Sequence, residues 1–142
     1  MKKKNSRVFT WIKRISLGFL TLLLLMILFF AGTIIFDAIF GSDTADFANI
    51  EYTDATGQEL AGYLAMPDSS GPHPPILLIN EWWGLNEGIT ILADALAEEG
   101  YMGLAPDGYR GQVANTIPRA LWLRLTTPTE QVEGDMDTSL AH

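Results

Sequence analysis

The 142-residue sequence contains no cysteine. This absence excludes disulfides, thiolate metal sites, a cysteine nucleophile and a lipid-modified cysteine within these residues. The two histidines, His73 and His142, lie too far apart to give a metal-ligand spacing. We therefore expect no metal site, and no motif in the sequence indicates a cofactor.

Charge is divided along the chain, because the first 36 residues contain no acidic side chain. Six of the nine basic residues lie within the first fourteen positions. From Asp37 onward the chain contains three arginines and seventeen acidic residues, which gives that part a formal charge of −14. Such an acidic surface repels phosphate groups, so the sequence argues against nucleic-acid binding.

The segment from Ile15 to Phe36 is a run of 22 residues without a charge. A helix needs about 20 residues to cross the bilayer core, and it satisfies its own backbone hydrogen bonds there. Basic residues precede the run and Asp37 follows it, so the positive-inside bias places residues 1–14 in the cytoplasm and the rest outside. The sequence predicts a single-pass membrane protein anchored in the lipid bilayer through residues 15–36.

A cleaved signal peptide is the competing interpretation of this run. Its apolar region is usually about 7–15 residues long and is followed by small residues at a cleavage site. The run here is longer, and its small residues, Ala31-Gly32-Thr33, lie inside it. These features favour an anchor that is not cleaved.

The remainder predicts a short polar spacer, residues 37–46, and then an α/β domain over residues 47–142. Strands over 47–53 and 58–66 flank a turn and form a hairpin. Strand, helix and strand then follow over 76–80, 86–100 and 101–105, where Asn86 caps the helix and Gly100 ends it. This pattern predicts one parallel βαβ unit. Its first strand is expected to be buried on both faces. Its helix is expected to have an apolar stripe, formed by Ile89, Leu92, Ala93 and Leu96.

Two further helices are expected near the end of the chain. One is short and includes residues 121–125, and the other starts at a capping box, Thr127-Pro128-Thr129-Glu130, and runs towards His142. A hairpin and two parallel strands leave sheet edges exposed and the core small. We therefore expect the domain to continue beyond residue 142 or to be completed by a partner.

Two segments should hold the functional site, because ligands of open α/β sheets bind beyond the carboxyl ends of the strands. These are residues 80–86 and 106–111, and the stretch that contains both reads ILLINEWWGLNEGITILADALAEEGYMGLAPDGYRG. This stretch resembles the dienelactone hydrolase family. The resemblance implies the N-terminal half of an α/β-hydrolase domain that acts on an ester or a lactone through a Cys-His-Asp triad.

The resemblance also implies roles for individual residues. Glu81 matches the glutamate that interacts with the resting nucleophile, and Trp82 matches the residue whose backbone N–H stabilises the oxyanion. Some members bind a substrate carboxylate with an arginine; Arg110 is the substrate-binding candidate, beside Arg119 and Arg124. Without the resemblance, Glu81 is a solvated loop carboxylate, Trp82 packs over the sheet end and Asp107 is a turn residue.

The nucleophile motif of the family, G-x-C-x-G or G-x-S-x-G, does not occur in these residues. The triad aspartate and histidine would follow that motif, so we expect the chain as given to be inactive by this mechanism. Two hypotheses follow: a membrane-anchored dienelactone-hydrolase-like enzyme whose nucleophile lies beyond residue 142, or a tethered α/β domain without catalysis. A third hypothesis is a small membrane protein whose acidic tail binds cations.

Overall fold

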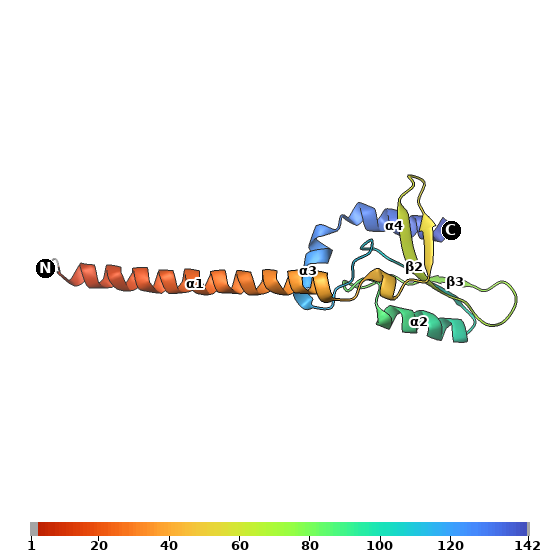
Figure 1. Ribbon diagram of the computed structural model, residues 1–142, viewed down its shortest axis with the longest axis horizontal. Coiled ribbons are helices and arrows are strands. Elements are labelled where there is room, and N and C mark those ends of the chain that lie inside the picture. Colours follow the sequence, from red (N-terminus) through yellow and green to blue (C-terminus); the bar gives the residue numbers. More distant parts are fainter. Residues whose placement is uncertain (1–2, 142) are drawn as a thin grey trace.

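The computed structural model describes residues 3–141 and shows a long helix that leads into an α/β unit (Figure 1). Helix α1 spans Lys3–Phe40, so it extends beyond the predicted anchor at both ends. Its stretch from Val8 to Phe40 is long and apolar enough to cross a membrane, and the most apolar part of it is not buried. A signal sequence near the N-terminus can also form a helix that is long and apolar enough, so these features establish the helix and not its crossing of a membrane.

The α/β unit is built on a four-stranded mixed sheet in the order β1-β2-β4-β3. The strands are β1 (Ile50–Thr53), β2 (Glu59–Ala65), β3 (Pro75–Leu77) and β4 (Met102–Pro106). The pairs β1–β2 and β2–β4 are antiparallel, and β3–β4 is parallel. The predicted hairpin and the predicted parallel pair are both confirmed, and the β2–β4 pairing joins them into one sheet.

Strand β3 is shorter and more exposed than its sequence predicts. The Leu78 N–H still donates to the Leu104 carbonyl at 2.7 Å, but the Ile79 side chain is 68% exposed. The prediction of a strand over 76–80 that is buried on both faces was therefore wrong. Because β3 lies at the edge of the described sheet, one side of it has no neighbouring strand.

Helices cover the two faces of the sheet, with α2 on one and α4 on the other (Figure 1). Helix α2 (Glu87–Glu98) starts at Asn86, whose side chain accepts from the Gly88 and Ile89 N–H groups, as predicted. Ala93 is completely buried, because its backbone packs against Gly103 of β4. Leu92 was expected on this inner stripe, but it is 47% exposed.

Helices α3 (Ile117–Thr126) and α4 (Thr129–Ala141) follow β4. Ala120 and Leu123 of α3 are buried in a second apolar cluster, together with Tyr109 and Ala114. The observed helix α3 therefore begins four residues before the predicted stretch 121–125. Thr127 ends α3 by donating its N–H to the Leu123 carbonyl at 2.9 Å, and α4 begins two residues later.

The segment predicted as a spacer, residues 37–46, is packed against the domain. It is helical through Phe40, and Asp37 is only 4% exposed. One Asp37 carboxylate oxygen accepts from the Asn115 N–H at 3.0 Å and from the N–H and hydroxyl of Thr116, each at 2.9 Å. Asp37 therefore caps the N-terminus of α3 and joins α1 directly to the α/β unit.

Tyr52 of β1 makes one pH-dependent contribution to stability. Burial, together with the carboxylates of Asp135 and Asp107, raises the pKa of Tyr52, while its hydrogen bond to Ser139 lowers it. The unfolded chain therefore loses this proton first, so stability should fall as the pH rises above about 10, by at most about 1.4 kcal/mol per pH unit. Melting of the whole chain in detergent between pH 8 and 11 should show this fall, and Tyr52→Phe should reduce its slope. Equal slopes would contradict this role of Tyr52.

Candidate functional site

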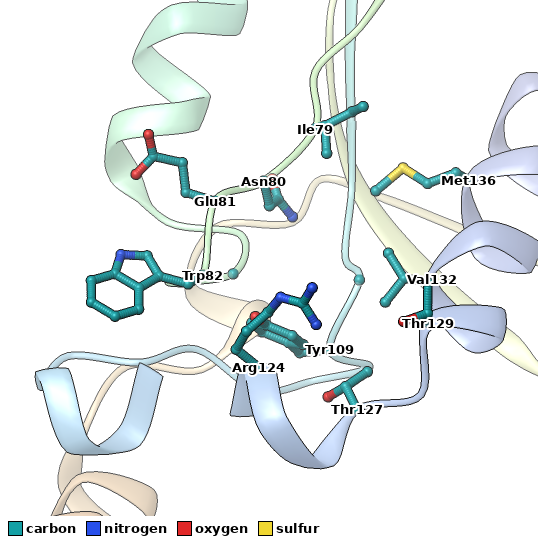
Figure 2. Close-up of a pocket in the computed structure, with 12 residues that line it drawn as sticks. Ile79, Asn80, Glu81, Trp82, Tyr109, Arg124, Thr127, Thr129, Val132 and Met136 are labelled. Carbon is teal, nitrogen blue, oxygen red and sulfur yellow. The ribbon is translucent and has the colours of Figure 1, made fainter. Parts of the chain in front are cut away.

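A cleft of about 310 Å³ lies beyond the carboxyl ends of β3 and β4 (Figure 2). The two segments that were predicted to form the site, residues 80–86 and 106–111, contribute to it from one side. Helices α3 and α4 and the turn between them contribute from the other. The lining residues are Ile79, Asn80, Glu81, Trp82, Gly84, Gly108, Tyr109, Arg124, Thr127, Thr129, Val132 and Met136.

One wall of the cleft is a tight turn from Glu81 to Gly84. The Gly84 N–H donates to the Glu81 carbonyl at 3.2 Å, and Gly84 adopts a φ of +83°. A Cβ atom at Gly84 would lie 2.9 Å from the Gln112 carbonyl oxygen, so the turn rests directly on the loop after β4. The Ala114 N–H also bonds the Trp83 carbonyl at 2.9 Å, which fixes the turn in place.

The Trp82 backbone amide is a hydrogen-bond donor at this turn. Among residues 3–141 its N–H has no hydrogen-bond acceptor. The Trp82 ring stacks edge-on against Trp83, with 5.3 Å between the ring centroids, and both rings pack against the cluster around Tyr109. The side chain thus has a packing role, and the amide remains available to a ligand.

Buried polar groups hold the floor of the cleft. Asp107, 2% exposed, accepts from the Thr44 hydroxyl at 2.7 Å, from the Tyr109 N–H at 2.9 Å and from the Gly111 N–H. Its predicted role as a turn residue is confirmed by these contacts. The Asn80 amide nitrogen donates to the Pro106 carbonyl at 2.6 Å, while its buried carbonyl oxygen has no partner in the part of the chain that the structure describes.

Glu81 lies at the rim of the cleft and is exposed. In Figure 2 its carboxylate lies on the side of α2, turned away from Val132 and Met136 of α4. The structure therefore brings Glu81 and the Trp82 amide to one cleft. Their catalytic roles remain predictions.

The arginine at the cleft is Arg124 and not Arg110, the residue that sequence analysis named. Arg110 does not line the cleft, since its guanidinium forms a two-point ion pair with the buried Asp135, at 2.9 and 2.7 Å. Arg119 is buried and donates to the Gln112 side chain at 2.7 Å. Arg124 and Tyr109 both line the cleft (Figure 2), and the charge of Arg124 counteracts the burial that raises the pKa of Tyr109.

This arrangement combines apolar walls with few polar groups. Ile79, Val132 and Met136 offer aliphatic surface, while Arg124 and the Trp82 amide offer donors. Sites of this kind bind small organic molecules, and a guanidinium selects those that carry an anionic group. The cleft therefore suits a small, partly apolar molecule with a carboxylate or a developing negative charge.

Comparison with known proteins agrees with this architecture. A sequence model described as "Dienelactone hydrolase family" matches residues 60–142. A protein of Aquifex aeolicus named "Putative carboxymethylenebutenolidase" is 40% identical over 87 residues, which is 59% of this chain and 35% of the relative. A protein of Escherichia coli K12 with the same name is 34% identical over 101 residues, 67% of this chain and 37% of the relative.

A solved structure shares the fold. The crystal structure described as "Putative Dienelactone Hydrolase" from Klebsiella pneumoniae superposes with a TM-score of 0.56 at 30% sequence identity, and the match covers 68% of this chain and 44% of that one. The chain spans a little over a third of the length of the curated relatives named above.

Proposed function

Because the chain belongs to the dienelactone hydrolase family, we propose that it is part of a membrane-anchored hydrolase that cleaves an ester or a lactone. The observation that carries this proposal is the cleft beyond the carboxyl ends of β3 and β4, which Glu81, Trp82 and Arg124 all line. Active sites of open α/β sheets are built at this position.

In this proposal the chain supplies the oxyanion side of the site. A nucleophile adds to the substrate carbonyl carbon, and the Trp82 N–H donates a hydrogen bond to the negative charge that develops on the carbonyl oxygen. One such donor typically contributes about 3–4 kcal/mol to transition-state stabilisation. Glu81 positions the resting nucleophile at the rim. The nucleophile, the aspartate and the histidine of the triad come from outside residues 1–142.

The substrate is proposed to be a small lactone or ester that carries a carboxylate. The name of the relatives, carboxymethylenebutenolidase, denotes action on a butenolide lactone with a carboxymethylene arm. Arg124 can pair with such a carboxylate, while Ile79, Val132 and Met136 contact the apolar part of the substrate.

Helix α1 is proposed to be an uncleaved anchor, with its basic end in the cytoplasm and the α/β unit on the other side. Two observations support this. The most apolar part of the stretch Val8–Phe40 is not buried. Basic residues precede the apolar run, and the acidic domain follows it. Protease added outside intact cells should then digest the domain and spare the N-terminus, and protection of the domain would contradict this orientation.

Hydrolysis of a p-nitrophenyl ester tests the proposed activity. The assay compares the chain of residues 1–142 with the longest polypeptide that its locus encodes. We expect turnover only from the longer polypeptide, and Glu81→Ala should lower its kcat/KM by about tenfold or more, since the nucleophile then loses its partner. Glu87→Ala, at another exposed glutamate six residues away, should leave the rate unchanged.

A second substrate separates the role of Arg124 from that of Glu81. Arg124→Met should weaken turnover of a carboxylated lactone by about fivefold, as expected for a partly solvated ion pair, and spare the uncharged ester. If the locus encodes nothing longer and no polypeptide turns over, the hydrolase proposal fails. The chain would then be a tethered α/β domain without catalysis.

A further inference from the structure

Helix α3 has a second apolar face that nothing in the described chain covers. Its inner residues, Arg119, Ala120 and Leu123, are at most 9% exposed and face the domain. Four apolar side chains on the opposite side of the helix are between 46% and 81% exposed. We call this group the outer face of α3; it consists of Ile117, Leu121, Trp122 and Leu125. Soluble proteins seldom expose such a contiguous apolar group unless it is an interaction site.

The outer face is directed back along α1. Figure 1 shows α3 crossing the C-terminal end of α1, with the sheet, α2 and α4 lying beyond it. Because the inner residues of α3 point towards the domain, the outer face points towards the apolar length of α1. The two helices are fixed to each other by the three hydrogen bonds that Asp37 accepts from Asn115 and Thr116.

The outer face also continues the apolar surface of α1. Phe36, Ile39 and Phe40, in the last turns of α1, are 64%, 65% and 71% exposed. The uncharged run 15–36 is about 33 Å long as a helix, which matches the roughly 30 Å thickness of a bilayer core. A bilayer crossed by this run ends near Phe36, at the level where Asp37 holds the start of α3.

The distribution of charged residues also favours contact between this surface and a membrane. Residues 108–129 contain no acidic side chain, although the chain from Asp37 onward carries a net charge of −14. All three arginines of that part lie in this stretch, and two of them are on α3, the buried Arg119 and Arg124. Anionic headgroups repel the acidic surface elsewhere, whereas apolar side chains, a tryptophan and an arginine are typical of helices that lie in the membrane interface.

We infer that α3 is an interfacial helix, whose outer face docks into the bilayer that α1 crosses. The inference rests on the proposed anchoring by α1 and goes beyond it, since a simple tether would leave the domain free above the membrane. Because Arg124 and Thr127 also line the cleft, docking of α3 holds the cleft beside the headgroups.

Lipid contact can be measured residue by residue, because the chain has no cysteine to compete with an introduced label. The whole chain is reconstituted in phosphatidylcholine–phosphatidylglycerol vesicles with a single environment-sensitive fluorophore. The label sits at Leu125→Cys or Leu121→Cys on the outer face, at Leu24→Cys within α1, or at Ile91→Cys on α2. Ile91 is the matched control, since it is an apolar helical residue that is 60% exposed.

We expect blue-shifted emission and quenching by spin-labelled lipid at Leu125, Leu121 and Leu24, and neither at Ile91. Quenching at Leu24 with water-like emission at Leu125 and Leu121 overturns the docking of α3 and leaves the anchor intact. Loss of quenching at Leu24 overturns the anchor itself. Blue-shifted emission at Leu125 without quenching by lipid means that protein covers the outer face, and this also overturns the inference.

Discussion

Replacing Asp107 with alanine is expected to lower the free energy of unfolding by about 4 kcal/mol. Asp107 is 2% exposed, and its carboxylate accepts hydrogen bonds from Thr44, Tyr109 and Gly111. Each bond to a charged acceptor contributes about 1.5–3 kcal/mol, and removing the acceptor leaves buried donors without a partner. The loss also releases the segment after α1 from the loop that forms the floor of the cleft.

Asp54→Ala is the matched control for this change. Asp54 also accepts three hydrogen bonds, from the Thr56 N–H and hydroxyl and from the Gln58 N–H, but it lies in the exposed turn between β1 and β2. Water can replace these bonds, so the loss should be much smaller than at Asp107. Urea unfolding of the whole chain in detergent, followed by tryptophan fluorescence, measures both. Equal losses would show that the burial of Asp107 is not what makes it important.

Replacing Gly84 with alanine is expected to cost about 3 kcal/mol and to distort the cleft. Two effects add at this position. The φ of +83° disfavours any residue with a Cβ by about 1–2 kcal/mol. The new Cβ would also lie 2.9 Å from the Gln112 carbonyl oxygen and 3.1 Å from the Tyr109 ring, so the turn that carries Glu81 and Trp82 would have to move.

Gly57→Ala separates these two effects. Gly57 has nearly the same backbone conformation, with a φ of +87°, but no atom lies within 4 Å of its Cβ position. It should show only the conformational penalty of about 1–2 kcal/mol. Urea unfolding of the two variants measures the difference. If both lose equally, the close approach of the turn to the loop after β4 contributes nothing to stability.

Docking of α3 would connect the anchor to the site. Asp37 at the end of α1 caps α3, and α3 carries Arg124 into the cleft. A change in how α1 sits in the bilayer would therefore reach the cleft through a single capped helix. If α1 crosses the bilayer as proposed, this connection would give it a role in orienting the site, in addition to keeping the domain at the membrane.

The sequence by itself determined the parts that depend on local patterns. The charge-free run 15–36 predicted a long apolar helix, and the turn residues 54–57 between two candidate strands predicted the β1–β2 hairpin. Strand, helix and strand predicted the parallel β3–β4 pair. Because the carboxyl ends of parallel strands lie at one edge, the sequence also placed residues 80–86 and 106–111 in one cleft.

Only the tertiary structure decided what depends on residues far apart in the chain. Asp37 followed the apolar run and was assigned to a spacer, but the residues that donate hydrogen bonds to it, Asn115 and Thr116, lie 78 and 79 positions away. The sequence does not distinguish Arg110 from Arg124 as a ligand of the cleft. In the folded chain Arg110 forms an ion pair with Asp135 instead. Hydrophobic periodicity reports which face of an element is buried, whereas ion pairs and caps between elements form only once the chain has folded.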